Sequence, residues 1–126
     1  MGIFELLFGR KTLFKRTTIS QDLEELIQKD FTRVSELTKL GNPSSLRQAL
    51  IISDKSLDNA LRELYKGETM AERLKDARPR FDPDMYNKIW EAHKLRNAIV
   101  HESDFEPPYY VVEKAIFDLK RALLTF

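Results

Sequence analysis

The sequence predicts an all-α fold, an antiparallel bundle of four long helices with one additional short helix. Three observations favour this fold. Apolar residues recur at three- and four-residue steps over four long segments. Capping residues and glycine or proline stops separate these segments. No segment has the apolar/polar alternation of a half-buried β-strand, and there is no internal repeat.

The first long helix is predicted to begin at Ser20, a good N-cap, and to stop at Gly41. Its apolar stripe consists of Leu23, Leu26, Ile27, Phe31, Val34 and Leu37. One such stripe along an otherwise polar helix indicates a single buried face.

A turn at Asn42-Pro43 separates this helix from the second one. We assign the start of the second helix to a capping box formed by Ser45 and Gln48, and its end to Gly67. Its stripe is Leu46, Leu50, Leu57, Ala60, Leu61 and Leu64. Because the connection is short, we expect the two helices to be antiparallel neighbours.

The short helix is predicted to open at a capping box of Thr69 and Glu72 and to end near Ala77. The last helix of the chain follows a loop that ends near Pro108. Its stripe is Val112, Ala115, Ile116, Leu119, Ala122, Leu123 and Phe126. This regular spacing predicts a helix with one face in the core.

The penultimate helix is predicted to start at an Asp82 cap with Pro83 in its first position, and to reach His101. Its core stripe is Met85, Ile89, Ala92 and Ile99. Arg96 falls in the middle of this stripe. An arginine is rarely buried without a partner, so Arg96 needs a carboxylate, carbonyl groups or an anionic ligand. Geometry alone leaves a structural ion pair and a ligand site equally open.

Length and composition limit the function classes. A chain of 126 residues suits one domain, here residues 20–126 after an arm of residues 1–19. The 21 basic and 20 acidic residues give a net charge of +1, so attraction to nucleic acid must be local. The chain has no cysteine, which excludes disulfides and thiol chemistry and fits a cytoplasmic location. No segment is long and apolar enough to span a bilayer.

The arm of residues 1–19 carries Arg10, Lys11, Lys15 and Arg16 against a single acidic residue, Glu5. It also carries the apolar residues Ile3, Phe4, Leu7, Phe8, Leu13 and Phe14. We expect the arm to pack on its own domain or on a second copy. Contact with a membrane surface is the less favoured alternative.

Tyr86, Trp90, His93, Asn97 and His101 share a second face of the penultimate helix. Both histidines of the chain lie on it. A metal site would need a third ligand, and Glu102 points elsewhere on the helical wheel. The sequence has no His-Glu-x-x-His pattern. We therefore expect no metal and no cofactor, and a packed aromatic face with two imidazoles remains the simplest interpretation.

The segment Arg96-Asn-Ala-Ile-Val-His101 resembles the motif of HEPN domains (higher eukaryote and prokaryote nucleotide-binding). That motif is an arginine, four to six residues and a histidine, with a polar residue favoured after the arginine, here Asn97. The motif also lies near the end of a penultimate long helix in that family. The resemblance covers residues 20–126.

The resemblance implies a metal-independent endoribonuclease that acts as a homodimer, with the motifs of two protomers facing each other across one cleft. His101 would be the acid/base, Arg96 the phosphate clamp and Asn97 an orienting residue, with His93 and Glu102 in support. Arg96 and His101 lie about 140° apart on a straight helix, which favours a site shared between protomers. RNA is the expected partner, and a toxin or defence effector with a regulatory antitoxin is the expected setting.

Two alternatives remain open. One is a catalytically silent HEPN-like module that binds a nucleotide or a protein; the weaker one is a membrane-surface adaptor that uses residues 1–16. In HEPN toxins paired with a nucleotidyltransferase, a tyrosine lies two residues after the histidine, where this chain has Ser103. Tyr109 and Tyr110 are out of register, so silencing by nucleotidylation of that tyrosine is not expected.

Overall fold

The computed structural model describes residues 18–126, and every structural statement below refers to that part of the chain. Its helices are α2 (Gln21–Leu40), α3 (Pro43–Leu64), α4 (Met70–Asp76), α5 (Pro83–His101) and α6 (Tyr109–Leu123), with a 3-10 turn, η2 (Arg78–Arg80), before α5. No strand occurs among these residues. The all-α prediction, with four long helices and a short one, is confirmed.

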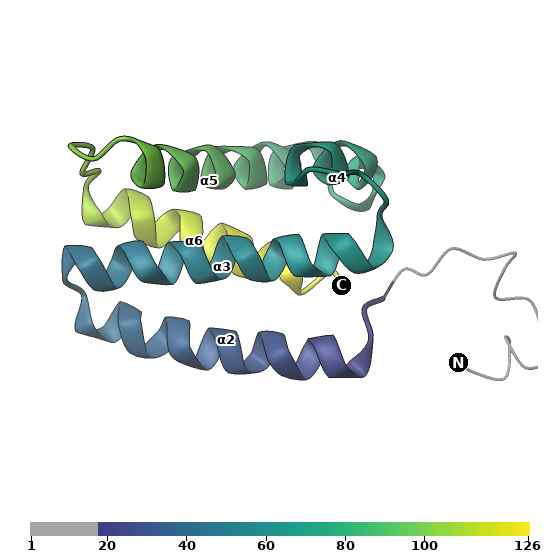
Figure 1. Cartoon of the computed structure of the whole chain (residues 1–126), viewed down its shortest axis with the longest axis horizontal. Coiled ribbons are helices and arrows are strands. Elements are labelled where there is room, and N and C mark those ends of the chain that lie inside the picture. The colour runs from purple at the N-terminus through teal and green to yellow at the C-terminus, as the bar shows by residue number, and fades with distance from the viewer. Residues whose placement is uncertain (1–17) are drawn as a thin grey trace, which may run out of the picture.

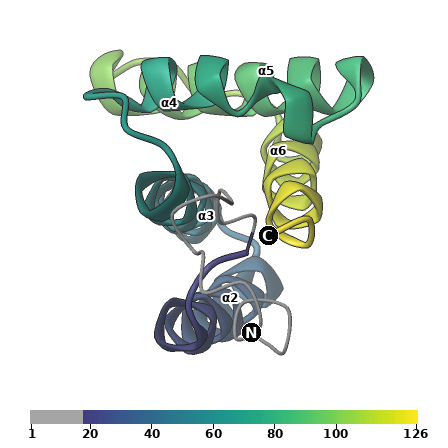
Figure 2. The ribbon, with the colours of Figure 1, turned by 90° about the vertical axis from the view of Figure 1, so that its right-hand side faces the viewer.

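Successive long helices reverse their direction along the molecule (Figure 1). α3 lies between α2 and α6, and contacts both of them extensively. Figure 2 looks almost along α2, α3 and α6, whereas α5 lies across the view. α5 therefore crosses α3 and α6 obliquely. Its packing against α6 is more extensive than its packing against α3.

Several predicted helix ends are confirmed. The Ser20 hydroxyl accepts a hydrogen bond from the Leu23 N–H, and Asp82 and Thr69 cap α5 and α4 in the same way. α2 ends at Gly41, whose φ of 70° lies in the left-handed region. Glycine adopts this conformation without a steric penalty, which explains why the helix stops there.

The two ends predicted for α3 are wrong. The N-cap is Asn42, whose side chain accepts from the Ser45 N–H at 2.8 Å, so Ser45 and Gln48 form no capping box. Pro43 therefore occupies the first helical position, where its missing N–H costs no hydrogen bond. At the other end the helix stops at Leu64, because Tyr65 is already extended with φ −132°.

The core is built from the predicted stripes. Its fully enclosed side chains include Leu50, Leu57, Leu61, Ile89 and Leu119, from α3, α5 and α6. Tyr86 and Trp90 pack against this core but are only partly buried. No helix within residues 18–126 is long and apolar enough to cross a membrane. The predicted arm lies outside the described residues except for Thr18 and Ile19.

Candidate functional site

α5 presents the polar residues singled out from the sequence along its second half. Met85, Ile89, Ala92 and Ile99 are buried as predicted, and they fix the rotation of the helix about its axis. His93, Arg96 and Asn97 then lie at the edge of the core and are partly buried. Arg96 projects from the same face of α5 as these four residues, as the helical wheel predicts. Its side chain is nevertheless 31% exposed, so it is only partly buried.

The carboxylate of Asp54, from α3, joins these residues into one group. His93 Nδ1 lies 3.1 and 3.0 Å from its two oxygens, and Arg96 Nε lies 3.8 Å from Oδ2. Arg96 Nη1 donates to Asn97 Oδ1 at 3.1 Å. We call Asp54, His93, Arg96 and Asn97 the Asp54 cluster. The structure therefore brings together three of the five predicted site residues.

The contact with Asp54 determines the hydrogen-bonding state of His93. A carboxylate can only accept, so Nδ1 must carry the proton that it donates to Asp54. Asp54 is 4% exposed, and its close partner His93 compensates the burial of its charge. The Trp90 ring meets the His93 ring edge to face, with centroids 6.3 Å apart. His93 is therefore fixed on two sides and holds Asp54 in place.

Arg96 is less well satisfied than this arrangement suggests. Its Nε is buried and makes no hydrogen bond with any described residue. The distance of 3.8 Å to Asp54 is an ion pair but too long for a hydrogen bond. Burying an unpaired N–H is costly, so Arg96 is not bonded as a purely structural arginine would be. The donors of Arg96 that a ligand could reach are those at the exposed end of its guanidinium.

Arg73 of α4 shows how this fold bonds an arginine that is purely structural. Its Nε and Nη2 donate to Asp58 Oδ1 at 3.1 and 2.7 Å, and its Nη1 donates to the Gly67 carbonyl at 2.7 Å. Its side chain is 6% exposed, against 31% for Arg96. The contrast indicates that Arg96 keeps donors for a group from outside the described residues.

His101 and Glu102 lie apart from the Asp54 cluster. His101 is the last residue of α5 and Glu102 is its C-cap, and both side chains are exposed. Neither side chain has a hydrogen bond or an ion pair with residues 18–126. α5 is continuous between Arg96 and His101, so the two point about 140° apart. Arg96 and His101, the two residues of the motif, therefore do not meet within a single chain.

Asp54 is the site residue that the sequence analysis missed. It lies four residues after Leu50 and three before Leu57, at the gap in the apolar stripe of α3. A carboxylate at a core position of a helix requires a buried partner. That interruption was the available signal, but the partner on α5 depends on the tertiary packing.

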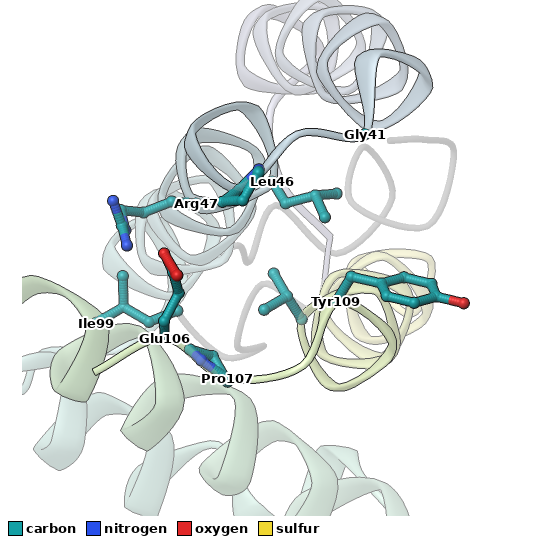
Figure 3. A pocket seen from close by; sticks show the side chains of 9 residues that line it. Gly41, Leu46, Arg47, Ile99, Glu106, Pro107 and Tyr109 are labelled. Atoms are coloured by element: carbon teal, nitrogen blue, oxygen red, sulfur yellow. The ribbon is translucent and has the colours of Figure 1, made fainter. Parts of the chain in front are cut away.

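A separate hollow of about 180 Å³ lies between the α2–α3 turn, the end of α5 and the start of α6. Figure 3 shows its lining, with Arg47 and Glu106 on one side and the Tyr109 ring directed away. Arg47 Nε is buried without a hydrogen bond to a described residue. No member of the Asp54 cluster lines this hollow.

The described residues contain no group of three or more His, Cys, Asp or Glu side chains that could hold a metal ion. The chemistry of the Asp54 cluster is that of a guanidinium with unused donors beside a fixed imidazole–carboxylate pair. Such an arrangement suits an anionic oxygen, since a guanidinium can donate two parallel hydrogen bonds to a phosphate.

Comparison of the chain with known proteins found no matching family model, no matching curated sequence and no matching solved structure.

Proposed function

We propose that this protein is a metal-independent endoribonuclease with a HEPN-like four-helix bundle, in which Arg96 binds the reacting phosphate and His101 moves the proton. The observation that carries the proposal is the state of Arg96. Its guanidinium is oriented by Asp54 and Asn97, its side chain is one-third exposed, and its Nη2 makes no hydrogen bond with a described residue. A phosphate oxygen is an acceptor that suits these donors.

The reaction follows from the chemistry of RNA. The ribose 2′-oxygen attacks the adjacent phosphorus as its proton passes to a base, and the bond from phosphorus to the 5′-oxygen breaks as that oxygen receives a proton. An imidazole can take the first proton or give the second near neutral pH. The guanidinium stabilises the charge that develops on the phosphoryl oxygens. The products are a 2′,3′-cyclic phosphate and a 5′-hydroxyl.

The separation of Arg96 and His101 on α5 supports a site shared by two protomers. A two-fold axis next to α5 would supply each residue twice, so that Arg96 of one protomer can act with the partner's His101. The exposed Val100 and the partly buried Trp90 lie between Arg96 and His101 around the axis of α5 and suit such an interface.

The test is RNA cleavage by purified variants in the presence of EDTA. Arg96→Ala and His101→Ala should each lose at least about a hundredfold in rate, because positioned acid–base and electrostatic groups contribute on this scale. Lys94→Ala is the matched control, since Lys94 is exposed on α5 two residues before Arg96 and its loss should leave the activity unchanged. Circular dichroism must show that all three variants remain folded. Equal activity of His101→Ala and wild type would refute the assignment.

A second candidate is a catalytically silent HEPN-like module that binds a nucleotide phosphate at Arg96. The observation in its favour is that Arg96 and His101 do not meet within one chain. This candidate predicts no RNA cleavage by any variant, together with a rise in the melting temperature of wild type, but not of Arg96→Ala, on adding nucleotides. Absence of any shift over a panel of nucleoside mono-, di- and triphosphates would eliminate it.

A further inference from the structure

An apolar groove runs between α2 and α6, away from the Asp54 cluster. Two adjoining hollows of about 650 and 360 Å³ form it, and both are lined by Phe31 and Lys120. Its remaining apolar lining is Ile19, Ile27, Val34, Ile116, Phe117, Leu123, Leu124 and Phe126. We call this feature the α2/α6 groove. In Figure 2, α5 lies across the top of the view, α6 lies below it on the right, and α2 lies at the bottom.

Large apolar side chains of α6 and of the residue that follows it are exposed at the groove. Leu124 is 78% exposed and Phe117 is 58% exposed. A contiguous patch of this kind marks an interaction site, whereas single exposed apolar residues do not. The groove is therefore a surface that favours an apolar partner.

The described chain begins at the groove, which favours the preceding segment of the same chain as the partner that covers it. Thr18 and Ile19 line the end of the groove, and the Ile19 N–H donates to the Phe126 carbonyl at 3.4 Å. The next residue is held as well, because the Ser20 N–H and hydroxyl donate to Glu63 at 2.8 and 2.7 Å. The seventeen preceding residues thus join the fold at a fixed point on the groove.

Composition and reach agree with this placement. Residues 3–14 include the six apolar residues of the predicted arm, from Ile3 to Phe14. α2 has 20 residues and is therefore about 30 Å long. The ten steps along the chain from Phe8 to Thr18 can span about 33 Å when extended, so the whole groove lies within reach.

Charge also favours the arm at the groove end near α2. The first turn of α2 carries Asp22 and Glu24, and Glu24 lines the groove. The arm carries Lys15 and Arg16 only a few residues before that turn. The attraction between these opposite charges favours an arm that folds back over α2. Lys120 on the α6 side adds one positive charge to the rim of the groove.

We propose that residues 3–14 of the same chain dock into the α2/α6 groove and bury its exposed apolar side chains. A tethered segment is present at an effective concentration on the order of millimolar, so it has the advantage over a separate partner at ordinary protein concentrations. This inference is independent of the proposed ribonuclease activity.

The absence of cysteine makes a direct test simple, because one introduced cysteine carries one spin label. A nitroxide at Gln28→Cys, on the groove rim, should remove most of the NMR intensity of the amides of residues 3–8. The same label at Asn87→Cys, exposed on α5, should leave these amides unchanged. Equal broadening from both labels, or no broadening from position 28, would overturn the proposal.

Two further measurements separate the other occupants. Chains without a nitroxide can be observed after mixing with spin-labelled chains. If broadening appears only in such a mixture, the groove binds a second copy. If the full chain floats with anionic vesicles, the groove binds a membrane surface. Either result overturns the proposal.

Leu124→Glu should abolish the broadening that the label at position 28 causes in residues 3–8. Leu40 is also largely exposed but lies outside the groove, so Leu40→Glu should preserve the broadening.

Discussion

Arg73 and Arg96 both face carboxylates of α3, at Asp58 and Asp54 respectively. Arg73 is enclosed and makes three hydrogen bonds, whereas the only hydrogen bond of Arg96 within the described residues goes to its neighbour Asn97. An arginine whose three side-chain nitrogens all donate to its own fold contributes to stability. One whose donors are free for an incoming acceptor contributes to binding.

Replacing each arginine by methionine tests this difference. Arg73→Met should lower the free energy of unfolding by roughly 2–4 kcal/mol, because it leaves the partly buried Asp58 carboxylate and Gly67 carbonyl without this donor. Arg96→Met should change it by no more than about 1 kcal/mol, since the pair with Asp54 is long and partly exposed. Urea unfolding measures both values. Equal losses would mean that Arg96 is a structural residue.

His93 and His101 allow a second comparison, of a partly buried residue with an exposed one on the same helix. His93→Ala should destabilise the fold by about 1–3 kcal/mol, because the buried Asp54 carboxylate loses its closest donor. His101→Ala should change stability by less than about 0.5 kcal/mol, because His101 is exposed at the end of α5. Thermal and urea unfolding of both variants are the measurement. A strongly destabilised His101→Ala would contradict the placement of His101.

Helical periodicity identified the polar face of α5 from the sequence, and the described structure brings His93, Arg96 and Asn97 together as neighbours. It could not identify Asp54, because the stripe of α3 shows only that a core position is polar. Which residue satisfies that carboxylate depends on how α5 crosses α3, and this crossing is a tertiary property.

At the scale of the elements, capping chemistry was the most informative local signal. Ser20, Thr69 and Asp82 all act as N-caps where the sequence places them. α3 is the exception, because two capping residues compete within four positions. Asn42 acts as the cap because Pro43 then occupies the first helical position, where a proline is favoured.

This competition gives a prediction for α3. Asn42→Ala should lower the free energy of unfolding by about 1 kcal/mol, because the Ser45 N–H loses its acceptor. Ser44→Ala, one residue beyond Pro43 and exposed, is the control and should change stability by less than about 0.5 kcal/mol. The denaturant midpoints of the two variants measure this difference in stability. A larger effect at Ser44 would place the cap elsewhere.

At the scale of the whole molecule, the central fact is that one chain separates Arg96 from His101 along α5. Both side chains are at least partly exposed, and no described residue of the chain bridges them. If they act together, a second protomer must supply the other residue. The sequence alone predicted this separation from the helical wheel, and the continuous α5 maintains it.

Mixing inactive variants tests the shared site. Arg96→Ala and His101→Ala homodimers should each be inactive. After mixing and exchange of protomers, the heterodimer holds one Arg96 opposite one His101 of the partner subunit, so part of the cleavage activity should return. Sedimentation must confirm the dimer. Exchange without any recovery would indicate that Arg96 and His101 act within one protomer.

The most direct test of the account is the chemistry of the RNA ends. Wild-type protein incubated in EDTA with a mixed RNA pool should leave 2′,3′-cyclic phosphates and 5′-hydroxyls, and His101→Ala should leave neither. Such ends would establish 2′-hydroxyl attack without a metal ion and would assign His101 to the reaction. Ends with 5′-phosphates, or unchanged cyclic-phosphate ends from His101→Ala, would contradict it.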